Sequence, residues 1–310
     1  MTAPHHSSPL ALHNATHQAL TFAMPAGACD CHTHVFGPAQ QFPFAAERQY
    51  TPGDASVAEL LQLHAHLGLE RVVIVHPSPY GADNACTLDG LRQLGERSRG
   101  VAVIDQGTTD EELHAMHVLG VRGIRLNLET GGVHDPVIAA QQLHWASARV
   151  ATLGWHIQLY TNLAVLASLA DVIETLPMPL VVDHFCGAQA ALGTQQQHFD
   201  VLLRLVRAGK VWVKLSAPHR ISKLADCVDA APIAQALIAA NPARMLWGSD
   251  WPHPGAQPGR PRRVDEIEAF NAIDDGRALN RLHAWVGDAA TLRQILVDNP
   301  ARLYDFTDNI

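Results

Sequence analysis

Residues 28–34 read Ala-Cys-Asp-Cys-His-Thr-His, and residues 245–253 read Met-Leu-Trp-Gly-Ser-Asp-Trp-Pro-His. Both stretches begin as apolar, strand-like runs, and they lie near opposite ends of the chain. Residues two apart in a β-strand point to the same side, so His32 and His34 are expected to project together with Asp30 behind them. Two such imidazoles can hold a divalent metal or donate hydrogen bonds to an anionic oxygen, and Asp250 can supply a base. The combination requires a fold that joins the two ends of the chain, as a closed barrel does.

Strand-like segments recur along the rest of the chain. Continuous apolar runs such as Val-Val-Ile-Val at 72–75 are typical of strands that are buried on both faces in a parallel sheet. We therefore expect eight strands, at residues 28–35, 71–76, 101–105, 121–128, 156–161, 180–184, 211–216 and 245–250.

Helix-like segments alternate with these strands. Apolar residues at helical spacing predict helices at 57–67, 86–98, 110–119, 136–153, 163–175, 195–208, 226–240 and 288–299. Eight strand–helix units predict a (β/α)8 barrel of the TIM type. The rival fold, a doubly wound open sheet, would need a glycine-rich phosphate-binding turn after an early strand, and the sequence has none. We expect a flexible tail at 1–27 and one barrel domain at 28–310.

Composition narrows the class of protein. The formal net charge of −8 argues against a nucleic-acid or anionic-membrane partner, because no basic stripe is available to neutralise phosphates. Five cysteines form no recognisable disulfide framework, and residues 1–29 contain no Lys or Arg to begin a secretory signal. No apolar run approaches the ~18 residues of a membrane span. We expect a cytoplasmic protein, a monomer or homo-oligomer, whose partner is a small anionic molecule.

Polar side chains occur where the predicted strands end, and in a barrel those ends carry the chemistry. We predict that the catalytic residues are Asp250, His32, His34 and His184. An arginine at a buried strand end requires an anion, so Arg125 and Arg220 are predicted to bind a substrate carboxylate. The other candidate binding residues are Tyr50, Ser78 and Tyr160. Each residue also has a purely structural interpretation, as a core histidine, a loop cap or a surface ion pair.

Several motifs together resemble the 2-pyrone-4,6-dicarboxylate lactonase group of the amidohydrolase superfamily. They lie at residues 30–38, 48–52, 81–84, 122–127, 154–156, 182–184 and 247–254. The resemblance covers residues 28–304 and implies a (β/α)8 barrel that hydrolyses lactones of small carboxylic acids from aromatic or sugar-acid breakdown. It implies that Asp250 activates water. It further implies that His32, His34 and His184 polarise the carbonyl, and that the substrate carboxylate contacts Tyr50, Ser78, Arg125, Tyr160 and Arg220.

Two departures from that group concern the substrate. The dicarboxylate lactonases carry an arginine just after the fourth strand, where this chain reads Leu-Glu-Thr-Gly-Gly at 128–132. They also carry Gly-Arg-Pro soon after the sixth-strand histidine, where this chain reads Cys-Gly-Ala at 186–188. Because two arginines that could bind carboxylates are missing, we expect the substrate to be a lactone with one carboxylate or with a sugar-acid hydroxyl pattern.

The sequence leaves the metal and the exact reaction open. A binuclear centre is not expected, because Arg125, Asn127 and Tyr160 stand where its bridging ligands would be. We expect no cofactor; the alternative is one zinc or manganese ion held by His32, His34, His184 and Asp250. By resemblance, the dicarboxylate lactonases work without a metal and related sulfomuconolactone hydrolases use zinc. Alternatives to hydrolysis are a lactone isomerase, a metal-dependent decarboxylase and a barrel that only binds a carboxylate.

Overall fold

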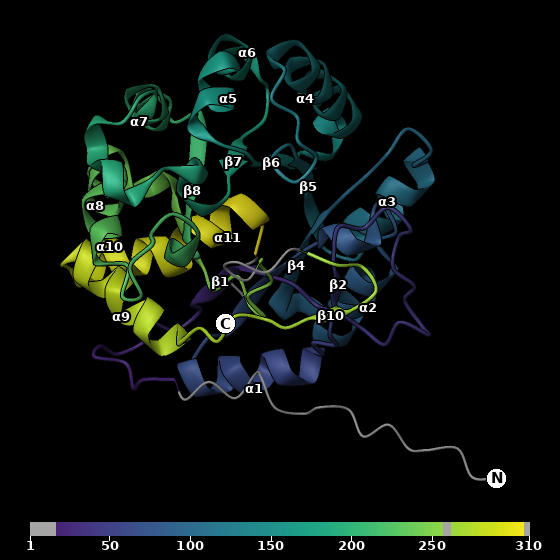
Figure 1. Cartoon of the computed structure of the whole chain (residues 1–310), viewed down its shortest axis with the longest axis horizontal. Coiled ribbons are helices and arrows are strands. Elements are labelled where there is room, and N and C mark those ends of the chain that lie inside the picture. The colour runs from purple at the N-terminus through teal and green to yellow at the C-terminus, as the bar shows by residue number, and fades with distance from the viewer. Residues whose placement is uncertain (1–16, 257–261, 307–310) are drawn as a thin grey trace.

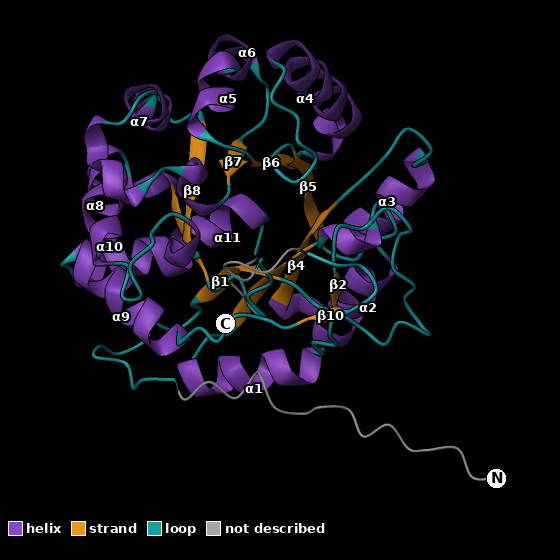
Figure 2. Ribbon diagram, in the orientation of Figure 1, coloured by secondary structure: helices purple, strands orange, loops and turns teal. Residues whose placement is uncertain are grey.

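The structure is a computed structural model, which describes residues 17–256 and 262–306. Eight parallel strands form an inner ring that is surrounded by helices (Figures 1 and 2). In order around the ring they are β1 (Cys29–Thr33), β3 (Arg71–Val75), β4 (Ser98–Ala102), β5 (Val121–Asn127), β6 (His156–Tyr160), β7 (Leu180–Val182), β8 (Val211–Ser216) and β9 (Met245–Gly248). The short strands β2 (Thr51–Pro52) and β10 (Ile267–Glu268) pair with each other outside the ring. The predicted (β/α)8 barrel is confirmed.

Helices follow the strands, most of them on the outside of the ring. They are α1 (Val57–Leu67), α2 (Ala85–Leu94), α3 (Asp110–Val118), α4 (Pro136–Val150), α5 (Leu163–Ser168), α6 (Ala170–Thr175), α7 (Phe199–Arg207), α8 (Ala231–Ala240), α9 (Asp275–Val286), α10 (Ala289–Arg293) and α11 (Asn299–Tyr304). The first begins at a capping box, in which Ser56 accepts from the Glu59 amide and the Glu59 carboxylate accepts from the Ser56 amide. This reciprocal pair fixes the start of α1 where the sequence predicts it.

Several predicted boundaries are wrong. The predicted helix at 195–208 begins only at Phe199, because His198 has a φ of 67° and a left-handed residue cannot continue a right-handed helix. The segment 163–175 forms two helices rather than one. The third strand lies at Ser98–Ala102 instead of 101–105, and α9 is missing from the prediction. Most core strands end one or two residues earlier than predicted, so His34, His184 and Asp250 lie on the turns just beyond them.

The barrel closes between its first and last strands. The Asp250 amide donates to the His32 carbonyl at 2.8 Å, and the His34 amide donates to the Trp251 carbonyl at 2.7 Å. The strands approach so closely that a Cβ at Gly248 would lie 2.5 Å from the His32 Cβ, so only glycine fits there. Closure of the barrel therefore places residues 28–34 beside residues 245–253.

Other segments cover the outside and the amino-terminal end of the barrel. Of the predicted tail, residues 1–16 lie outside the described residues, while Thr21 donates from its amide to the Asn280 side chain on α9 at 2.8 Å. At the amino-terminal end, Tyr304 of α11 is fully buried and packs edge-on against His156. No helix among residues 17–256 and 262–306 is long and apolar enough to cross a membrane.

Candidate active site

A cavity of about 350 Å³ lies at the carboxyl ends of the strands. Its wall contains all the predicted site residues except His32, namely His34, Tyr50, Ser78, Arg125, Tyr160, His184, Arg220 and Asp250. His32 is fully buried and lies behind the wall, next to Asp250. The structure thus brings the predicted set together.

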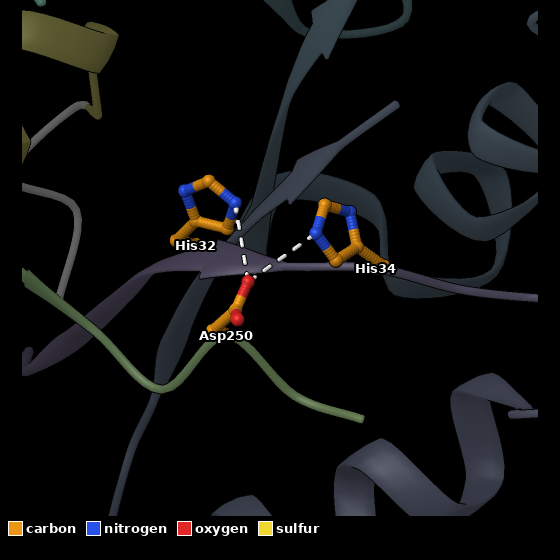
Figure 3. A group of neighbouring side chains, drawn as sticks. All are labelled: His32, His34 and Asp250. Atoms are coloured by element: carbon orange, nitrogen blue, oxygen red, sulfur yellow. Dashed lines mark ion pairs between the residues drawn. The ribbon is translucent and has the colours of Figure 1, made fainter. Parts of the chain in front are cut away.

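The Asp250 carboxylate is the centre of this arrangement. Its Oδ1 lies 3.5 Å from His34 Nε2, 3.6 Å from His32 Nε2 and 3.7 Å from His184 Nε2. Figure 3 shows His32, from β1, and His34, from the turn that follows it, both pointing to this carboxylate. Arg220 donates to the other oxygen, Oδ2, from Nε at 2.9 Å and from Nη2 at 2.6 Å. Burial would raise the pKa of Asp250, but the Arg220 guanidinium and the imidazoles hold it well below its usual range. Asp250 is therefore ionised at neutral pH.

A β-bulge directs the first-strand histidines into the barrel. The register of β1 against β3 shifts between Asp30 and Thr33, so one extra residue is inserted there. Asp30, predicted to lie behind the histidines, instead accepts from the Ser249 amide at 2.9 Å and faces His64 Nε2 at 3.4 Å. Asp30 thus ties the first strand to the last and takes no part in the cavity wall.

Each imidazole has a fixed neighbour on its Nδ1 atom. His34 Nδ1 lies 2.7 Å from the Val75 carbonyl, and His184 Nδ1 lies 2.8 Å from Ser216 Oγ. His32 Nδ1 faces Lys214 Nζ at 3.3 Å. Burial lowers the pKa of His32 to about 3 and that of His184 well below its ordinary value, so both rings are neutral.

A buried charged layer, formed by Asp183, Arg125, Gln158 and Lys214, lies beneath the cavity. Arg125 donates to Asp183 Oδ2 from Nε at 3.1 Å and from Nη2 at 3.0 Å. Gln158 donates to the same oxygen at 3.0 Å and accepts from Lys214 Nζ at 2.7 Å. The anion that the buried Arg125 requires is therefore supplied by the protein itself.

Sequence reasoning missed three members of the buried charged layer: Asp183, Gln158 and Lys214. A signal existed for Lys214, because it interrupts the apolar strand Val-Trp-Val-Lys-Leu-Ser at 211–216 and a fully buried lysine needs a partner. The partners come from other strands, and the sequence does not say which side chains meet across a barrel.

Arg262 is a further cavity residue that sequence reasoning missed. Its guanidinium carbon lies 4.3 Å from the centre of the Tyr50 ring, and its Nη2 donates to Glu268 at 3.0 Å. It belongs to the run Arg-Pro-Arg-Arg at 260–263, where no periodicity indicates which arginine points inward. Glu129 and Thr130 also line the cavity, on the segment where the resembled lactonases carry an arginine.

The predicted metal ligands provide suitable atoms but a poor electrostatic setting. Two groups, His32–His34–Asp250 and His32–Asp183–His184, each place their ligand atoms within 4.8 Å of one another. Imidazole and carboxylate are ordinary zinc ligands. However, Arg220 bonds Asp250, and the Lys214 ammonium lies against His32. A divalent ion would therefore add positive charge next to two fixed cations, which the low local dielectric makes unfavourable.

Comparisons with known proteins agree with the fold. The profile of the family described as Amidohydrolase matches residues 29–306. The chain is 37% identical over 293 residues to a 2-pyrone-4,6-dicarboxylate hydrolase of Comamonas testosteroni, covering 91% of this chain and 92% of that protein. It is also 37% identical over 289 residues to a 4-sulfomuconolactone hydrolase of Rhizobium radiobacter, covering 92% of each.

Two further similarities extend this comparison. A D-galactarolactone isomerase of Agrobacterium fabrum is 25% identical over 286 residues, covering 91% of this chain and 92% of that protein. A solved structure of a Pseudomonas putida protein superposes with a TM-score of 0.76 at 31% identity, covering 91% of this chain and 99% of that one. The resemblance drawn from the motifs is confirmed.

Proposed function

Because the chain belongs to the amidohydrolase family, we propose that it hydrolyses the ring ester of a small carboxylated lactone from aromatic or sugar-acid catabolism. The observation that carries this proposal is the ionised Asp250, which lies among three imidazoles in the wall of a cavity that also presents guanidinium groups. Both hydrolases at 37% identity act on lactones according to their names, which supports the same reaction class here.

Asp250 is the proposed general base. Arg220 holds Oδ2 through two hydrogen bonds, which leaves Oδ1 to accept a proton from a water in the cavity. The same two bonds fix the plane of the carboxylate. The activated water would then attack the lactone carbonyl and place negative charge on its oxygen.

The two cavity-lining imidazoles suit different steps. When Ser216 donates to His184 Nδ1, the His184 proton is on Nε2 and can stabilise the oxyanion. His34 Nδ1 must donate to the Val75 carbonyl, so His34 Nε2 donates only after it has received a proton. His34 can therefore carry the proton from Asp250 to the ring oxygen that leaves, which completes the hydrolysis.

The substrate carboxylate is proposed to contact the guanidinium atoms that the protein does not already use. Arg125 Nε and Nη2 already donate to Asp183, and Arg262 Nη2 already donates to Glu268. Arg262 Nε is buried with no hydrogen-bond partner among the described residues. The carboxylates of the protein offset most of this positive charge, and Glu129 adds a negative charge to the wall. A single substrate carboxylate is thus better matched than two.

Isomerisation is the alternative reaction, favoured by the similarity to the D-galactarolactone isomerase. A hydroxyl of the substrate would take the place of water, and Glu129 in the wall could accept from such hydroxyls. Turnover of a lactone panel in ¹⁸O-labelled water separates the reactions, because hydrolysis places the label in the product carboxylate and isomerisation does not. No turnover of any lactone in the panel would contradict both and favour the carboxylate-binding barrel.

We further propose that the reaction needs no metal or other cofactor and takes place in the cytoplasm. The cations Arg220 and Lys214 beside the candidate ligands support the first proposal. All five cysteines are buried free thiols, which supports the second, because a reducing compartment keeps thiols in that state.

A further inference from the structure

The buried charged layer contains a lysine in contact with one active-site histidine. Lys214 lies within β8 and is fully buried. Its Nζ donates to Gln158 Oε1 at 2.7 Å and lies 3.7 Å from Asp183 Oδ1 and 3.3 Å from His32 Nδ1. Lys214 does not line the cavity, so it acts on the substrate site through its neighbours, of which His32 faces Asp250.

We propose that Lys214 is a positioning residue that holds the His32 proton on Nε2 and so makes His32 a hydrogen-bond donor toward Asp250. An ammonium group has three N–H donors and no lone pair. The atom facing it, His32 Nδ1, must therefore accept, and a neutral imidazole then carries its one proton on Nε2. The role assigned to Asp250 in this inference rests on the proposed function; the position of the proton does not.

Asp183 is the competing neighbour. Its Oδ1 lies 3.2 Å from His32 Nδ1 and would favour a proton on that nitrogen. However, Asp183 Oδ1 is poorly aligned with His32 Nδ1 and also faces Lys214 Nζ at 3.7 Å, whereas Lys214 Nζ and His32 Nδ1 are well aligned at 3.3 Å. The side-chain amide of Gln158 lies between the two charges, with its oxygen toward Lys214 and its nitrogen toward Asp183. The arrangement of these side chains therefore favours the contact of His32 Nδ1 with Lys214 over its contact with Asp183.

The result is an opposite proton assignment for His32, on β1, and His34, on the turn that follows it. The Val75 carbonyl forces the proton of His34 onto Nδ1, while the Lys214 ammonium forces that of His32 onto Nε2. His32 Nε2 faces Asp250 Oδ1 at 3.6 Å, and this nitrogen has no hydrogen-bond partner among the described residues. A proton on Nε2 lets His32 donate toward the Asp250 carboxylate, which a lone pair on that nitrogen could not do.

This assignment also conflicts with His32 as a metal ligand. A metal binds the lone pair of an imidazole nitrogen, and in the group His32–His34–Asp250 the His32 Nε2 atom that faces Asp250 carries the proton. Ligation would require the proton to move to Nδ1, directly against the lysine. Lys214 therefore selects against a metal at this position.

Nitrogen NMR of the wild-type protein labelled with ¹⁵N-histidine tests the assignment directly. The His32 signals are identified by their loss in His32→Gln. We expect Nε2 to show the shift of a proton-bearing nitrogen and Nδ1 that of a lone-pair nitrogen. The reverse pattern would overturn the proposal, whether or not any lactone is turned over.

Variants of Lys214 test its consequence. In Lys214→Met we expect the Nδ1–H tautomer of His32 to appear, and zinc affinity, measured by competition with a chromophoric chelator, to rise. We expect kcat to fall by ~10-fold or more, because a wrong tautomer impairs catalysis, while KM stays within ~2-fold. The matched control is Lys223→Met, since Lys223 is exposed and its substitution should leave the His32 tautomer, zinc affinity, kcat and KM unchanged. Unchanged His32 shifts in a folded Lys214→Met protein would contradict the role of the lysine.

Discussion

His32 and His156 are alike in burial and in their lowered pKa, but they differ in their partners and in their position in the barrel. Both are fully buried, and burial lowers the pKa of each to about 3. His32 lies near the carboxyl end of β1, with Lys214 on one nitrogen and Asp250 near the other. His156 begins β6 at the opposite end of the barrel, where neither nitrogen has a partner among the described residues. A low pKa therefore does not mark a functional histidine; its partners and its place in the barrel do.

The largest effect on activity should come from substituting the proposed base, Asp250, at the carboxyl end of the barrel. Asp250→Asn should lower kcat by ~10² or more, because a general base typically contributes 10²–10⁴. The measurement is kcat on the best substrate of the lactone panel, with circular dichroism to show that the barrel still folds. A folded Asn variant with near-normal kcat would remove the functional distinction between the two ends of the barrel.

A second test concerns the charge of the substrate at that end. We expect a lactone with one carboxylate, or a hydroxylated aldonolactone, to be used at least ~10-fold more efficiently than 2-pyrone-4,6-dicarboxylate. The reason is that an unpaired, desolvated carboxylate forgoes a charge-assisted contact of ~1.5–3 kcal/mol. Side-by-side values of kcat/KM for the three substrates decide the matter. If the dicarboxylate is preferred, Arg262 must bind the second carboxylate and Glu129 must turn away from the cavity.

A substitution at the amino-terminal end of the barrel should leave activity nearly unchanged, in contrast to one at Asp250. His156→Phe replaces two buried nitrogens that lack partners with an apolar ring, so stability should stay the same or rise by ~1 kcal/mol. We expect kcat to stay within ~2-fold of the wild-type value. Thermal unfolding and kcat, measured on the same preparation, provide the check. A large loss of kcat with unchanged stability would show that this end also serves catalysis.

Prolonged chelation of metal ions should have the smallest effect on activity. Because fixed cations already occupy the surroundings of Asp250 and His32, activity is expected to survive dialysis against a chelator. Elemental analysis before and after dialysis accompanies the assay. One tightly bound zinc per chain, with activity lost on its removal and restored on its return, would contradict both this prediction and the assigned tautomer of His32.

The same contrast explains what the sequence could predict. The barrel follows from apolar strands alternating with helices, and its geometry alone gathers strand-end residues such as Arg125 and Asp250 around one cavity. The sequence could not show the bulge that turns His32 inward and Asp30 outward, because strict alternation assumes an unbroken register. Nor could it show that Asp183 already holds Arg125, because that contact joins residues 58 apart in the chain.

The hydrogen bond that closes the barrel has a consequence for how the protein gains its activity. The Asp250 amide reaches the His32 carbonyl only when the last strand has docked against the first. A chain that has folded its first seven strands would have most of the cavity wall and would lack the proposed base, Asp250. Catalytic activity therefore reports the final docking step, and in a refolding experiment it should return with the last strand rather than with the bulk of the secondary structure.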